Sequence, residues 1–151
     1  MTSASPSDRL PDRLRDPGAY RHWTPVELRF RDIDLLGHVN NVALTGWLED
    51  GRARLELPIQ PIAPGAGGPA IVLAELRVQF LAEVHFEDAV RVGTGIERLG
   101  RTSVTLGQAV FAGDRCAVIA RVIEVLIDDR TRAPIPWPAH FATLFERYLI
   151  S

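Results

Sequence analysis

The densest cluster of side chains that could carry chemistry lies in residues 32–41, with the sequence D-I-D-L-L-G-H-V-N-N. It holds two carboxylates, one imidazole and two amides directly before a segment with helical periodicity. The free N–H groups of a helix N-terminus attract negative charge, so they could stabilise a carbonyl oxygen during acyl transfer. A nearby carboxylate could attack the carbonyl carbon or deprotonate a water. Asp and Asn are also ordinary capping residues, so the residue types alone leave a structural role open.

The elements on either side of this segment follow from hydrophobic periodicity. Residues 26–31 alternate between apolar and polar side chains, which predicts a half-buried strand. After the polar segment, Leu44, Leu48, Gly51 and Leu55 fall on one stripe of a helix that Pro58 ends. Gly46 and Gly51 weaken a helix, which indicates that something packs closely against each of them.

Four more strands are expected in residues 75–80, 90–97, 104–110 and 117–127, and the last is apolar enough to lie inside the sheet. Turns at residues 99–101 and 112–114 predict hairpins, residues 58–69 a loop, and residues 138–149 a closing helix. One long helix on one side of an antiparallel sheet is an α+β architecture. Because five strands leave open edges, we expect an edge to be covered by dimerisation.

Composition removes several classes of function. All 17 cationic residues are arginine, so Schiff-base and P-loop lysine chemistry are excluded, and the single cysteine, Cys116, excludes an intrachain disulfide. A net charge of −2 gives no reason to expect nucleic acid, and no apolar run is long enough for a membrane span. The scattered histidines predict no metal site. We expect a cytoplasmic protein with a flexible tail over residues 1–22 and one domain over residues 23–151.

The polar segment, together with Glu49 and Arg52 on the following helix, resembles the D-x-D-x-x-G-H-V-N-N…E-x-x-R pattern of hotdog-fold acyl-CoA thioesterases. The likeness is strongest to the 4-hydroxybenzoyl-CoA thioesterase-like group and extends over residues 27–141. It implies a five-stranded antiparallel sheet wrapped around one long helix, a homodimer or homotetramer, and hydrolysis of an acyl-CoA to a free acid and CoA. It implies no cofactor.

The resemblance also implies roles for residues. Asp34 matches the nucleophile or general base, and the backbone N–H that polarises the thioester carbonyl falls near Asn41. Asp32 is the rival carboxylate, with a structural role favoured by its place at the strand end. His38 and Asn40 match the motif and are expected to orient the substrate or the loop.

Other assignments stay open at this point. Glu49 is a second catalytic candidate, because related hotdog enzymes use a helix carboxylate, but an ion pair with Arg52 is the favoured alternative. The CoA phosphates are expected to meet a turn that includes Arg98, Arg101, Thr102 and Ser103, which could equally be a solvated turn. Alternative functions are a hotdog-fold enoyl-CoA hydratase or dehydratase and a non-catalytic acyl-CoA-binding module.

Overall fold

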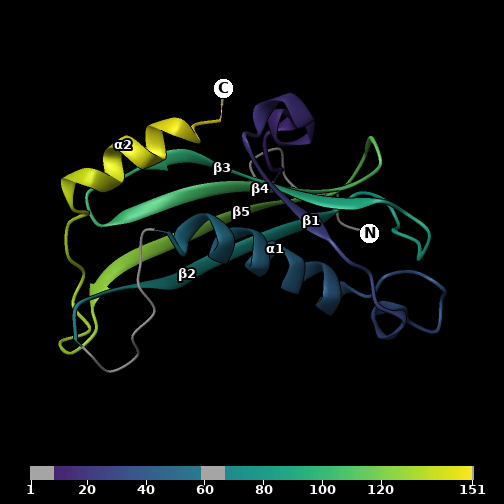
Figure 1. Ribbon diagram of the computed structural model, residues 1–151, viewed down its shortest axis with the longest axis horizontal. Helices are drawn as coiled ribbons and strands as arrows, with labels where there is room; N and C mark the ends of the chain where they lie inside the picture. Colours follow the sequence, from purple (N-terminus) through teal and green to yellow (C-terminus); the bar gives the residue numbers. More distant parts are fainter. Residues whose placement is uncertain (1–8, 59–66, 151) are drawn as a thin grey trace.

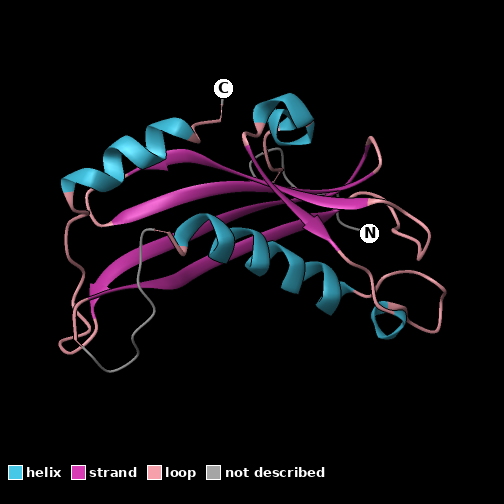
Figure 2. Cartoon of the chain, viewed as in Figure 1, coloured by secondary structure: helices cyan, strands magenta, loops and turns pink. Residues whose placement is uncertain are grey.

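The computed structural model describes residues 9–58 and 67–150, and its main feature is one antiparallel sheet of five strands (Figures 1 and 2). Along the sheet the order is β1-β3-β4-β5-β2, so β5 lies inside the sheet as predicted. The strands are β1 (His22–Val26), β2 (Pro69–Phe80), β3 (Val90–Leu99), β4 (Ser103–Ala112) and β5 (Arg115–Asp128). The two predicted hairpins join β3 to β4 and β4 to β5. Most of the loop predicted for residues 58–69 lies outside the described residues.

The long helix α1 (Asn41–Glu56) lies across one face of the sheet (Figure 1). Its buried residues include the predicted stripe, with Leu48 fully buried and Leu44 and Leu55 nearly so. Full burial of one such leucine contributes about 1.5–3 kcal/mol. Packing of this stripe against β3, β4 and β5 therefore fixes the helix on the sheet, and with it the polar segment before the helix.

The two helical glycines differ in their surroundings. A Cβ at Gly51 would lie 2.9 Å from Oγ1 of Thr94 and 3.2 Å from Nε2 of Gln108, whereas a Cβ at Gly46 would meet nothing within 4 Å. Close packing is therefore confirmed at Gly51. At Gly46 the expectation is wrong, because this residue faces the open cavity between α1 and β1.

This difference makes a matched pair of variants. We expect Gly51→Ala to lower the free energy of unfolding by about 1–2 kcal/mol, because the added methyl overpacks the helix–sheet contact. Gly46→Ala should raise it by up to about 1 kcal/mol, because only helix propensity changes. Urea denaturation of both variants checks the prediction, and equal effects of the two would contradict it.

The first strand ends earlier than its sequence pattern predicts. β1 covers His22–Val26, and Phe30 begins a short 3-10 helix (Phe30–Asp32). The last pair between β1 and β3 joins Val26 to Val90, where β3 begins, so no strand lies beyond it to continue the ladder. Leu28 still packs against the core, but Phe30 is exposed. The alternation thus reflects partial burial and not strand pairing.

The predicted tail is wrong for the residues just before β1. Two 3-10 turns, Asp12–Arg15 and Pro17–Ala19, pack on the sheet face opposite α1, where Leu14 is fully buried and the Tyr20 hydroxyl donates to its carbonyl oxygen. Glycines in the strands make this possible, because a side chain at Gly107 would collide with Leu14 and one at Gly93 with Tyr20. Residues 1–8 lie outside the described residues.

The C-terminal segment covers the rest of the edge that β1 begins. Helix α2 (Ala139–Arg147) buries Phe141 and Phe145, which confirms the predicted closing helix. After it, the N–H of Ile150 donates to the carbonyl oxygen of Ile96, and the N–H of Ile96 donates to that of Tyr148. The opposite edge, β2, has no further strand beside it in the described part of the chain. None of the helices in that part is long and apolar enough to cross a membrane.

Candidate active site

A tight loop before α1 holds the carboxylate of Asp34. One of its oxygens, Oδ1, accepts hydrogen bonds from the N–H groups of Leu36 at 2.8 Å and His38 at 3.4 Å. The N–H of Asp34 donates to the carbonyl oxygen of His38 at 2.9 Å, and Gly37 takes a φ of 83° that closes the turn. The second oxygen, Oδ2, has no hydrogen-bond partner among the described residues, and Asp34 is exposed. The loop therefore fixes this carboxylate and leaves one oxygen free to react.

The N-terminus of α1 follows directly. Asn40 caps the helix, because its Oδ1 accepts from the N–H of Ala43 at 2.8 Å, and its Nδ2 donates to the carbonyl oxygen of Asp32 at 2.8 Å. The N–H groups of Asn41 and Val42, the first two residues of the helix, meet no acceptor in the described part of the chain. Two unpaired donors at the positive end of a helix dipole can stabilise negative charge on an oxygen placed beside them.

The rival carboxylate Asp32 is engaged in the local backbone. Its Oδ2 accepts the N–H of Arg29 at 2.9 Å, and its carbonyl oxygen accepts the N–H of Asn40 at 2.8 Å. These bonds join the end of the 3-10 helix Phe30–Asp32 to the cap of α1. Asp32 thus shapes the loop that presents Asp34, in keeping with the structural role favoured for it.

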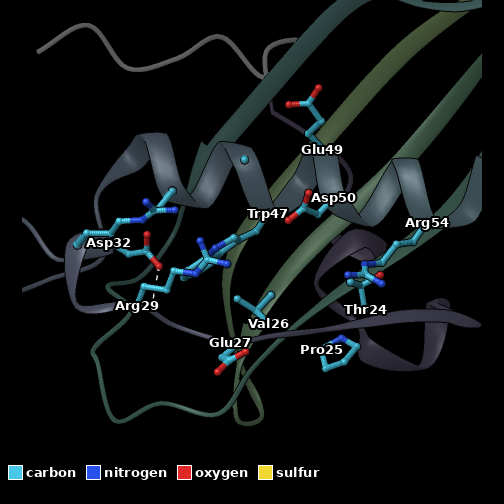
Figure 3. Close-up of a pocket in the computed structure, with 13 residues that line it drawn as sticks. Thr24, Pro25, Val26, Glu27, Arg29, Asp32, Trp47, Glu49, Asp50 and Arg54 are labelled. Carbon is cyan, nitrogen blue, oxygen red and sulfur yellow. Dashed lines mark hydrogen bonds between the residues drawn. The ribbon is translucent and has the colours of Figure 1, made fainter. Parts of the chain in front are cut away.

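Glu49 lies exposed on α1, eight residues beyond Asn41, which corresponds to about 12 Å along a helix. It lines a cavity of about 710 Å³ between β1 and α1, together with Trp47 and Arg54 (Figure 3). Asp34 is not among the residues that line this cavity. The predicted ion pair between Glu49 and Arg52 is not formed, because Arg52 turns into the core and forms an ion pair with Glu124. Glu49 is therefore separated from both the helix N-terminus and its expected partner.

The structure does not bring the predicted phosphate-binding turn to Asp34 within one chain. Arg98, Arg101, Thr102 and Ser103 lie at the β3–β4 turn, whereas Asp34 follows the end of β1 that pairs with Val90. The ten residues of β3 separate these two ends by about 30 Å. Figure 1 shows the turn and the loop at opposite ends of the sheet.

A buried polar network beneath α1 was not expected from the sequence. Nε of Arg52 donates to Oε1 of Glu124 at 3.0 Å, and its NH1 donates to Oε1 of Gln108 at 3.1 Å. Gln108 in turn donates to the carbonyl oxygen of Leu48 at 2.8 Å and to Oγ1 of Thr94 at 2.9 Å. All four side chains are buried, so the network ties the helix to three strands. The signal available in the sequence was the polar Gln108 and Glu124 at otherwise apolar strand positions.

Glu56, in the last turn of α1, joins this network as a neutral acid. Burial raises its pKa to about 10, with further contributions from a hydrogen bond to Glu124 and from the charge of Glu124. The protonated carboxyl can donate to Glu124, whose Oε2 is otherwise buried without a partner among the described residues. The two carboxyl groups therefore share a single negative charge, which the guanidinium of Arg52 balances.

This arrangement predicts a pH dependence of stability. In the folded protein Glu56 keeps its proton above its ordinary pKa of 4.5, whereas the unfolded chain releases it there. The unfolded state thus binds fewer protons, and this contribution to stability is lost progressively as the pH rises from 4.5 to about 10. We expect Glu56→Gln to remove this dependence and to stabilise the protein by about 1 kcal/mol or more near pH 9. Denaturation midpoints across that range, with the exposed Glu146→Gln as control, provide the test; parallel curves would contradict it.

Comparison with known proteins shows the family to which the chain belongs. Residues 28–145 match the thioesterase-like superfamily, and the chain belongs to that family. A comparison with curated proteins finds no match. Among the described residues, no group of three or more His, Cys, Asp or Glu side chains is placed to hold a metal ion.

Solved structures agree with the family assignment. A thioesterase from Thermus thermophilus, solved with coenzyme A and zinc, is 28% identical, with a TM-score of 0.74 over 85% of this chain and 93% of its own. The PA5185 protein from Pseudomonas aeruginosa is 24% identical, with a TM-score of 0.79 over 89% and 95%. A predicted thioesterase from Bacillus stearothermophilus is 24% identical, with a TM-score of 0.77 over 84% and 95%. The predicted hotdog fold and thioesterase resemblance are thereby confirmed.

Proposed function

We propose that this member of the thioesterase-like superfamily hydrolyses an acyl-CoA to a free carboxylic acid and CoA. One observation carries the proposal: the free oxygen of Asp34 lies in the loop that leads directly into the unpaired N–H groups of Asn41 and Val42. A carboxylate and two amide donors are the groups that acyl transfer requires. The coenzyme A bound by the Thermus thermophilus thioesterase supports a CoA thioester as the substrate.

The proposed reaction begins with the thioester carbonyl oxygen on the N–H groups of Asn41 and Val42, which polarise the carbonyl. Oδ2 of Asp34 then either attacks the carbonyl carbon or takes a proton from a water that attacks it. In both routes the carbon–sulfur bond breaks, its electron pair goes to sulfur, and CoA leaves as the thiol after protonation. The direct route passes through an anhydride that water hydrolyses, so the overall products are the same.

Asp34 is preferred over Glu49 because of its position relative to the helix N-terminus. A reacting carbonyl has to touch both the amide donors and the attacking group, within about 3–3.5 Å of each. The loop brings Asp34 to the start of α1, whereas Glu49 lies about two turns along the helix. His38 and Asn40 support the loop and the cap, and we propose that they orient the site.

We further propose a homodimer that pairs β2 with β2 of a second copy, with a homotetramer as a further stage of assembly. β2 has no further strand beside it in the described part of the chain. Exposed apolar side chains near the loop indicate a covered surface as well: Phe30, Leu35, Leu36, Val42 and Phe86 are each at least half exposed. Light scattering of the purified chain tests the oligomeric state.

Such a dimer would also bring the predicted phosphate-binding turn of one protomer toward the active site of the other. Antiparallel pairing of two β2 strands turns the partner's sheet end for end. The turn that holds Arg98, Arg101, Thr102 and Ser103 would then lie at the same end of the joint sheet as Asp34 of the other protomer. We propose that this turn binds CoA phosphates across the interface. A cytoplasmic location also remains a proposal.

A thiol-release screen over short, long, branched and aromatic acyl-CoAs tests the proposed activity. We expect at least one of them to yield CoA and free acid in equal amounts. Consumption of an enoyl-CoA without thiol release would favour the hydratase or dehydratase alternative. Binding of acyl-CoA without any turnover would favour the binding module.

A further inference from the structure

Two histidines beside the candidate active site share one carboxylate. Nε2 of His38 lies 3.2 Å from Oε2 of Glu83, and Nε2 of His85 lies 3.8 Å from the same oxygen. The two rings meet edge to face, with centroids 5.5 Å apart. His38 belongs to the loop that holds Asp34, whereas the other two residues come from the segment between β2 and β3. The cluster therefore joins two separate parts of the chain at the site.

The segment that carries Glu83 is held firmly. NH2 of Arg115 donates to the carbonyl oxygen of Glu83 at 2.9 Å and to Oδ2 of Asp88 at 3.2 Å. The same Asp88 oxygen accepts the N–H of His85 at 2.8 Å. Between them, Val84 is almost fully buried. The backbone at Glu83 is thus fixed on both sides, and its carboxylate is held toward His38.

The contact with Glu83 favours one form of the neutral His38 ring. A carboxylate has no proton to donate, so the Nε2 that lies 3.2 Å from it is favoured as the protonated nitrogen, and Nδ1 is left for other contacts. The backbone of His38 is bonded to Asp34 in both directions, through its carbonyl oxygen and its N–H. Next to it, the N–H of Val39 donates to the carbonyl oxygen of Val84 at 2.8 Å. Orientation of His38 is therefore linked to the loop that presents the reacting carboxylate.

We propose that Glu83 is a positioning residue for the reaction: it fixes the ring orientation and tautomer of His38 and thereby the loop that holds Asp34. This inference rests on the proposed thioesterase activity. In this role Glu83 does not contact the substrate, and His85 lies 3.8 Å from the same carboxylate oxygen. An exposed contact between a histidine and a carboxylate adds little to folding stability, so the role of Glu83 is in geometry and not in holding the fold together.

The test compares Glu83→Ala and Glu83→Gln with Glu87→Ala, a control that removes an exposed carboxylate from the same segment. We expect Glu83→Ala to lower kcat about tenfold or more with little change in KM or Tm, because a misplaced group costs rate and not binding. Glu83→Gln should recover most of the rate, since the amide oxygen still accepts from Nε2. In a His38→Asn background, Glu83→Ala should have no further effect, because its partner is absent. Additive losses, or a loss matched by a lower Tm, would overturn the proposal.

A second measurement is independent of turnover. Nitrogen-15 NMR of the full chain should show His38 protonated at Nε2 in the wild type and in Glu83→Gln, and a mixture of tautomers in Glu83→Ala. The same spectrum in all three proteins would overturn the proposal, even if no acyl-CoA is hydrolysed. If Asp34 proves essential while Glu83→Ala keeps the full rate, this inference fails and the proposed function stands.

Discussion

Asp34→Asn is expected to lower kcat for thiol release at least about 1,000-fold, because the amide can neither attack the thioester nor deprotonate water. The loss should be the same for the direct and the water-mediated route, since both need the free oxygen of this carboxylate. KM should change little, because the amide N–H groups that receive the carbonyl belong to α1 and are untouched. Steady-state thiol release with the best acyl-CoA from the screen measures the effect.

The control for this variant is built into the loop. The Asn oxygen can still accept from the N–H of Leu36, so Asp34→Asn should unfold at the wild-type temperature. Asp32→Asn removes the neighbouring charge but keeps an acceptor for the N–H of Arg29, and we expect it to cost less than about tenfold in kcat. Near-wild-type thiol release by Asp34→Asn would rule out Asp34 as the nucleophile or general base.

The second large effect is on stability. Arg52→Met should lower the free energy of unfolding by about 3–5 kcal/mol, because it leaves the buried charge of Glu124 without its cation. It also removes a donor from Gln108, which is fully buried. Methionine keeps a long side chain, so the loss reports electrostatics more than a cavity. Urea denaturation measures the change.

A double variant separates the charge from the packing. In Arg52→Met/Glu124→Gln the buried charge is absent, so the double variant should be more stable than Arg52→Met alone. A double variant that is less stable by the sum of both single losses would show that packing, and not the unpaired charge, dominates. The ion pair between Arg52 and Glu124 would then not be the main contribution of the network to stability.

The local parts of the fold could be predicted from the sequence. The Leu44–Leu48–Leu55 stripe and the two glycine turns depend on neighbours within a few residues, and α1 and both hairpins are found as predicted. The first strand was misplaced because pairing depends on where β3 begins, which the alternation in residues 26–31 does not contain. The tail prediction fails at Leu14 because its recess is made by the distant Gly107.

In the site, too, contacts between residues close in sequence were predictable and contacts between distant residues were not. The proximity of Asp34 to the start of α1 was predictable, since a few residues of loop separate them. The partner of Arg52 was not, because Glu124 lies 72 positions away and meets it only through the packing of α1 on β5. Glu83 was missed for the same reason, since its contact with His38 depends on two loops that meet in space.

The most direct test of the central claim compares Asp34→Asn and Glu49→Gln in one thiol-release assay, on the same acyl-CoA and at equal protein concentration. Both variants replace a carboxylate by its amide, so the comparison isolates position. If the catalytic carboxylate is the one beside the N-terminus of α1, Asp34→Asn should lose at least about 1,000-fold in kcat. Glu49→Gln should keep kcat within about tenfold of the wild type. An inactive Glu49→Gln together with an active Asp34→Asn would contradict the assignment of Asp34 as the catalytic carboxylate.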